Sequence, residues 1–179
     1  MKWIAQAACF LAWLAVLALP AGATIHRDPL TEVETDQLRE AAQDPPLKLK
    51  LFIKFARQRL ESAEALYADP KADPDRGQQI HDLLEDFGNL VDELSDNVDA
   101  YATRKEDLRK PLADIIAATS DFAARLKDFK AAAAASSAGA KESKAYNFAL
   151  EDAIDSVESG LRNAQELLEE QKEQFKKKK

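Results

Sequence analysis

The sequence predicts an all-α fold: an antiparallel bundle of about four to five helices, three or four of them long, packed like a coiled coil behind an N-terminal signal segment. Two observations support this class. The first is that only one short run alternates like a strand, and no other run offers it a partner for a sheet. The second is an apolar seam, with residues spaced as in helices that pack side by side. Its members recur at one interval of seven: Ile80, Phe87, Leu94, Tyr101, Leu108, Ile115, Phe122 and Phe129.

The N-terminus has the pattern of a secretory signal peptide. Lys2 is the only charge among the first 23 residues, and residues 3–19 are apolar except for Gln6. Pro20 and the small residues Ala21-Gly22-Ala23 follow, which predicts cleavage after Ala23. The alternative is an uncleaved anchor. It is disfavoured because a membrane span needs about 20 apolar residues.

Cleavage would remove the only cysteine, methionine and tryptophans, together with the charge of Lys2. It leaves 156 residues with a formal charge of −8. A mature chain without cysteine has no disulfide and no thiolate metal site. Its net acidity disfavours nucleic acid as a partner. We expect a secreted or periplasmic protein with no membrane span after cleavage, organised as a signal peptide (1–23), a tether with a short helix (24–44) and a bundle domain (45–179).

Two helices are expected before residue 70. Thr31 and Glu34 form a capping box that starts a short helix, which ends before Asp44-Pro45-Pro46. Apolar and charged residues alternate over 47–51, as in a strand. Apolar residues then recur every three or four positions up to residue 68, so a helix is favoured. Its apolar positions cover more than half of its circumference. We therefore expect this helix to be the most buried.

Residues 76–134 are predicted to form two helices, 76–104 and 107–134. Asp107 is the expected cap, and Pro111 lies in the first turn, where proline is tolerated. One kinked helix of nearly sixty residues is the alternative. A last helix over about 142–175 carries an apolar face, with Gly160 placed to permit close approach of a neighbour.

The sequence carries no pattern for catalysis or for a cofactor. There is no Gly-x-Ser-x-Gly turn and no glycine-rich phosphate loop. The two histidines are His26 and His81, and Gln78 stands where a di-iron bundle needs a glutamate. No zinc ligand set with suitable spacing is evident, and we expect His81 to be an ordinary surface histidine. The protein is therefore not expected to be an enzyme.

An acidic stripe is the most prominent charged feature. A calcium site is one interpretation, but a straight helix spreads its carboxylates instead of wrapping them around an ion. A solvated outer face is the expected state, and a docking face for a cationic partner is the alternative. A basic run (Lys48, Lys50, Lys54, Arg57 and Arg59) is expected to pair with this acidic helix. The acidic stripe comprises Asp82, Glu85, Asp86, Asp92, Glu93, Asp96 and Asp99.

These features predict a non-enzymatic exported module, structural or interacting, of the cell envelope. Phe148 and Phe175 lie off the main apolar face of the last helix and are candidate partner contacts. The partner is either another protein or a second copy of this chain, because a second copy can also bury the apolar residues that recur every seven positions. Calcium binding or buffering through the acidic stripe is one alternative function. A holdase-like periplasmic chaperone is another.

Overall fold

The computed structural model describes residues 28–69, 71, 74–135 and 137–176. The predicted signal peptide with its cleavage site, His26 and the last three lysines lie outside these residues. None of the described helices combines the length and the hydropathy that crossing a membrane requires.

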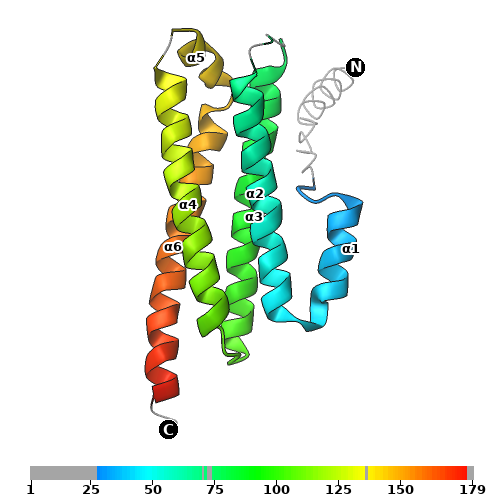
Figure 1. The fold of residues 1–179 in the computed structure, drawn as a ribbon, viewed down its shortest axis with the longest axis vertical. Coiled ribbons are helices and arrows are strands. Elements are labelled where there is room, and N and C mark those ends of the chain that lie inside the picture. Colours follow the sequence, from blue (N-terminus) through cyan, green and yellow to red (C-terminus); the bar gives the residue numbers. More distant parts are fainter. Residues whose placement is uncertain (1–27, 70, 72–73, 136, 177–179) are drawn as a thin grey trace, which may run out of the picture.

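Every regular element in the described residues is a helix, so the predicted all-α bundle is confirmed. Four helices are long, and short helical turns connect them or precede them (Figure 1). The elements are α1 (Glu32–Glu40), η1 (Ala41–Gln43), α2 (Pro45–Ala68), α3 (Arg76–Thr103), α4 (Arg109–Ala134), α5 (Ser137–Glu142), η2 (Ser143–Ala145) and α6 (Asn147–Lys176).

The four long helices form two antiparallel hairpins, α2–α3 and α4–α6, stacked side by side. Helices α2 and α4 run in one direction and α3 and α6 in the other (Figure 1). Helix α2 contacts α3 and α4, and α6 contacts the same two helices. Consecutive helices α3 and α4 therefore lie diagonally across the bundle. The neighbours α3 and α6 are parallel, as are α2 and α4.

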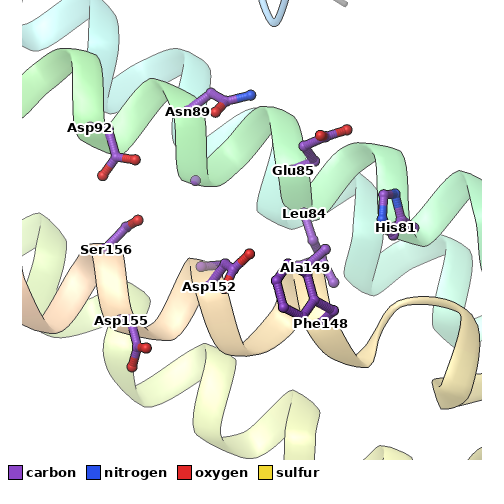
Figure 2. A pocket seen from close by; sticks show the side chains of 12 residues that line it. His81, Leu84, Glu85, Asn89, Asp92, Phe148, Ala149, Asp152, Asp155 and Ser156 are labelled. Carbon is purple, nitrogen blue, oxygen red and sulfur yellow. The ribbon is translucent and has the colours of Figure 1, made fainter. Parts of the chain in front are cut away.

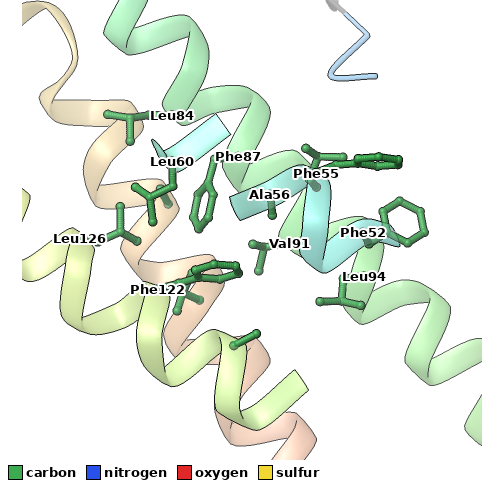
Figure 3. Packing of buried hydrophobic residues seen from close by; sticks show 14 of the residues in the cluster. Phe52, Phe55, Ala56, Leu60, Leu84, Phe87, Val91, Leu94, Phe122 and Leu126 are labelled. Carbon is green, nitrogen blue, oxygen red and sulfur yellow. The ribbon is translucent and has the colours of Figure 1, made fainter. Parts of the chain in front are cut away.

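The apolar seam fills the centre of this bundle, as predicted. None of its eight residues exposes more than 5% of its surface. The rings of Phe87 on α3 and Phe122 on α4 meet edge to face, with centroids 5.3 Å apart and planes at 82° (Figure 3). This geometry is the one that aromatic quadrupoles favour. The seam thus joins the two hairpins across the diagonal.

The helix starts before residue 70 follow the predicted signals. The Glu34 amide donates to Thr31 Oγ1 at 3.2 Å, and the Thr31 amide donates to Glu34 Oε2 at 2.8 Å, which completes the capping box. Asp44 accepts from the Leu47 amide at 3.0 Å, and proline occupies the first two positions of α2. The hydrogen bonds at these ends are therefore local and readable from sequence.

The structure also confirms two helices between residues 76 and 134. Helix α3 ends at Thr103 and α4 begins at Arg109, with Pro111 in its first turn. The prediction that Asp107 caps α4 is wrong, because the capping position is Leu108. The Asp107 carboxylate instead accepts from the Arg109 amide at 3.2 Å and from its guanidinium at 2.9 Å.

A glutamine of α6 holds the turn between α3 and α4. Gln171 is 4% exposed, and its Oε1 accepts from the Leu108 amide at 2.8 Å. Its Nε2 donates to the Glu106 carbonyl at 3.0 Å. The turn contains Lys105 at a φ of 61°, in the left-handed region. One buried side chain, 63 residues away from Leu108, therefore satisfies the free amide at the start of α4.

The burial of α2 differs from the prediction. Helix α2 buries six of its 24 residues, whereas α3 buries eleven of its 28. Helix α3 is the most buried because it packs against both α2 and α6 and faces α4 across the diagonal. Among the described residues, the outer side of α2 is covered only by the short helical segment α1 and η1 (Figure 1).

The basic run on α2 pairs mainly with α4, not with the acidic stripe on α3 as predicted. Lys50 lies 3.8 Å from Asp114, and Arg57 donates to Asp121 at 2.8 Å. The prediction failed because α2 and α4 are parallel neighbours. The bases of α2 therefore lie at the same height along the bundle as the acids of α4. Only Arg59 faces α3, and it is held mainly by α1.

Arg59 anchors α1 to the bundle through a nearly buried ion cluster. Its guanidinium donates to both Glu34 oxygens, at 3.0 and 2.6 Å, and to the Pro29 carbonyl at 2.8 Å. Its Nε lies 3.8 Å from Asp86 of α3. Burial alone favours the protonated acid, but the hydrogen bonds from Arg59 and Thr31 outweigh this effect, so the pKa of Glu34 lies below its usual value.

We predict that Gln171→Ala lowers the free energy of unfolding by about 1–3 kcal/mol, the cost of leaving a buried amide without an acceptor. Chemical denaturation measures this change. The control is Gln165→Ala, an exposed position of the same helix, where a change within about 0.5 kcal/mol is expected. Equal losses in the two variants would contradict the role assigned to Gln171.

We predict that Glu34 makes stability depend on acid pH. Because its folded pKa lies below the ordinary 4.5, the unfolded chain binds more protons as pH falls. The stabilisation is fully present above about pH 4.5 and is lost as pH drops through the folded pKa.

Thermal melts between pH 7 and pH 3 measure this dependence. Glu34→Gln should lower the melting temperature at pH 7 and flatten its decline in acid. The control Glu32→Gln changes an exposed glutamate of the same helix, so it should keep the slope of the unaltered protein. A slope unchanged by Glu34→Gln refutes the assignment.

Candidate functional site

The candidate site is a groove of about 370 Å³ between α3 and α6, close to the beginning of both helices. In Figure 2, Asp92 of α3 points toward Ser156 and Asp152 of α6, whereas Glu85 and Asp155 point away from the space between the two helices. Because α3 and α6 are parallel, residues near the start of one lie beside residues near the start of the other. The groove is lined by His81, Leu84, Glu85, Gly88, Asn89, Asp92, Phe148, Ala149, Asp152, Ala153, Asp155 and Ser156.

The floor of the groove consists of Gly88, Ala149 and Ala153, all of them buried. A Cβ atom placed on Gly88 would lie 3.8 Å from the Ala153 Cα atom, so the two backbones approach closely here. Small residues allow this approach, and their apolar atoms form the base of the groove, where packing covers almost all of them. Gly160 has a similar role farther along α6, where an added Cβ would lie 3.1 Å from Ser95 Oγ.

The rim of the groove consists of four carboxylates: Glu85 and Asp92 from α3, and Asp152 and Asp155 from α6. Residues 77–103 contain seven acidic residues and residues 147–161 four, and neither segment has a lysine or an arginine. None of the four rim carboxylates makes an ion pair with another described residue. The rim is therefore a concentrated, unpaired negative charge.

Some acids on other faces of the bundle are paired with bases of a neighbouring helix. On the far side of α6, Glu151 accepts from Lys130 at 2.8 Å and Glu158 lies 3.0 Å from Lys127. Arg125 of α4 donates to Glu64 of α2 at 3.0 Å. The helix dipole does not account for the rim, because its effect is confined to the first turn. The first turns of α3 and α6 contain no acid.

Among the rim carboxylates, Asp92 has a pKa that is shifted by its position in the groove. Although much of this side chain is exposed, the groove wall removes part of its hydration, and this raises its pKa. The charges of Asp96 and Asp152 raise it further, and a hydrogen bond from Ser156 opposes them. Keeping Asp92 ionised therefore costs free energy, and a cation bound near it would lower this cost.

A second cluster lies at the His81 end of the groove. One ligand atom from each of His81, Asp82 and Glu85 falls within 4.8 Å of the others. His81 Nδ1 lies 3.3 Å from Asp82 Oδ1, and the Gln78 amide donates to the same oxygen at 2.7 Å. The sequence analysis missed this set, although the spacing of four between His81 and Glu85 puts both on one helix face.

The acidic stripe is not the single outer face that the sequence predicted. Asp86 is only 8% exposed and faces α1 and α2, where it lies 3.8 Å from Arg59. Four of its other members, Asp82, Glu93, Asp96 and Asp99, lie outside the groove lining, whereas Glu85 and Asp92 belong to it. The α6 half of the rim was not foreseen, because sequence periodicity does not reveal which helix lies beside α3.

The two candidate phenylalanines differ in exposure. Phe148 is 76% exposed and stands at the end of the groove near His81 (Figure 2). Phe175 is half-buried, and the Arg109 guanidinium lies 4.3 Å from the centre of its ring. Only Phe148 therefore remains available as an exposed partner contact.

Comparison of the chain with protein-family models, with curated proteins and with solved structures finds no match. The chemistry of the groove must therefore be argued from its own residues. An anionic rim attracts cations, and an apolar floor with Phe148 beside it can cover an apolar side chain. The arrangement is suited to binding a group that is cationic and apolar at once.

Proposed function

We propose that the protein is a non-enzymatic helical-bundle module, exported to the cell envelope or beyond, that binds another protein through the groove between α3 and α6. The observation that carries this proposal is the unpaired rim of Glu85, Asp92, Asp152 and Asp155 above an apolar floor. The signal-peptide pattern of residues 1–23 supports export. The sequence offers no nucleophile motif or phosphate loop that would support catalysis.

We predict that a photo-crosslinking amino acid placed at Phe148 or Asp152 captures one discrete protein in the native cells. The matched control is the same amino acid at Ala124, which is exposed on α4 away from the groove. Gel electrophoresis after irradiation shows the adducts. Absence of an adduct at both groove positions, or the same adducts from all three positions, would refute the proposal.

A divalent cation is the second candidate ligand, supported by the cluster of His81, Asp82 and Glu85. A histidine nitrogen is unsuited to calcium, which prefers oxygen ligands, and favours a zinc-like ion. The alternative from the sequence, calcium along the acidic stripe, has less support, because the stripe divides between two sides of α3.

Titration with Zn²⁺ and, separately, Ca²⁺ tests the cation site. We predict a saturable rise in melting temperature with Zn²⁺ that His81→Ala removes and Glu93→Gln, an exposed change on the same helix, retains. A rise with Ca²⁺ alone, or one that survives His81→Ala, excludes the cluster as the site.

We propose no chaperone role. The large apolar side chains that are exposed in the described residues are Val33, Leu47 and Phe148, and they lie on three different helices. A holdase needs a broad apolar surface for unfolded chains. No group of these side chains supplies one.

A further inference from the structure

We infer that the occupant of the groove is a basic amphipathic helix of the partner protein, about three turns long. Its apolar side chains lie on the floor and against Phe148, and its lysines or arginines face the rim. This inference rests on the proposed function and specifies the chemistry of the partner.

The apolar part of the inference comes from the floor and from Phe148. Gly88, Ala149 and Ala153 place only apolar atoms at the base of the groove, although packing covers almost all of them. Phe148, 76% exposed, adds an aromatic face at one end. Burial of this ring by a partner removes apolar surface from water, which a metal ion or a simple polyamine does less effectively.

The inference that the ligand is cationic comes from the carboxylates of the rim. Four carboxylates that make no ion pair among the described residues line the edges of the groove, between two helices that supply no lysine or arginine there. The two rows stand on opposite sides of the floor, Glu85 and Asp92 on α3 and Asp152 and Asp155 on α6. A ligand that complements both rows carries cations on both flanks of an apolar stripe, which is the pattern of a basic amphipathic helix.

The shape of the groove favours a helix as the ligand. The α3 side of the lining runs from His81 to Asp92, a length of about 16 Å at 1.5 Å per residue. About eleven helical residues match this length. Two parallel neighbouring helices already present the ridges and grooves into which a third helix packs.

A defined peptide tests the inference without knowledge of the natural partner. The probe is a fluorescein-labelled synthetic peptide of about 14 lysines and leucines, four helical turns, with its leucines on one face. The control peptide has the same composition with leucines spread around the helix. Fluorescence anisotropy measures binding to the purified protein, and circular dichroism measures helix formation by the peptide. We expect the amphipathic peptide to bind and to become helical, and the control peptide to bind about tenfold more weakly.

Matched variants locate the binding site. The double change Asp92→Asn with Asp152→Asn should weaken binding about fivefold or more, because each exposed pair adds a modest amount. Phe148→Ser should weaken it as well. The control double change, Glu93→Gln with Asp128→Asn, removes two exposed acids outside the groove lining and the same net charge, so it should leave affinity nearly unchanged.

Each outcome is decisive. Equal weakening by the two double variants, or equal binding of the two peptides, would show attraction to net charge alone and overturn the inference. Absence of peptide binding would also overturn it, whether or not Zn²⁺ binds. If crosslinking at Phe148 captures a partner that lacks a basic amphipathic segment, the proposed function stands and this inference fails.

Discussion

The contact between Phe87 and Phe122 is the point on which the rest of the structure depends. Their helices, α3 and α4, lie diagonally, so the edge-to-face pair spans the middle of the bundle and joins the two hairpins. Burying each ring contributes about 1.5–3 kcal/mol, and the ring geometry adds about 0.5–1.5 kcal/mol. With the seam fixed at this diagonal, α3 must lie beside α6, and α2 beside α4. The parallel neighbours, and therefore the groove, follow from this packing.

The choice of neighbouring helices also decides the charge distribution. Bases of α2 meet acids of α4, as in Arg57 with Asp121, and lysines of α4 meet acids of α6. Helix α3 has no base after Arg76 and lies beside the acidic first half of α6. Negative charge therefore accumulates along one edge of the bundle while the other edges are largely paired. Exposed pairs contribute little to stability, so the uneven distribution has little effect on folding.

The groove combines two properties that rarely serve folding alone. Its small floor residues bring the backbones of α3 and α6 close together. Its rim holds Asp92, whose pKa is raised mainly because the groove wall removes part of its hydration and to a smaller extent by the charges of Asp96 and Asp152. A partner's cations would replace the hydration that the groove wall removes. Phe148 beside this rim gives the same surface an apolar contact. Charge, floor and ring lie together on one surface of the bundle, and the proposal of a binding site rests on this combination.

The sequence by itself determined the helical class, the capping box at Thr31, the break near Pro111 and the buried seam, because each depends on local hydrogen bonding or on periodicity along one helix. It named Phe148 and Phe175 together as candidate exposed contacts, of which Phe148 is exposed and Phe175 is half-buried. Only the tertiary structure decided which helices are neighbours. It therefore decided the burial of Asp86 beside Arg59, the bridge from Gln171 to Leu108, and the meeting of Asp92 with Asp152. The physical reason is that periodicity specifies which face of a helix is buried but not which helix covers it, and these partners are distant in sequence.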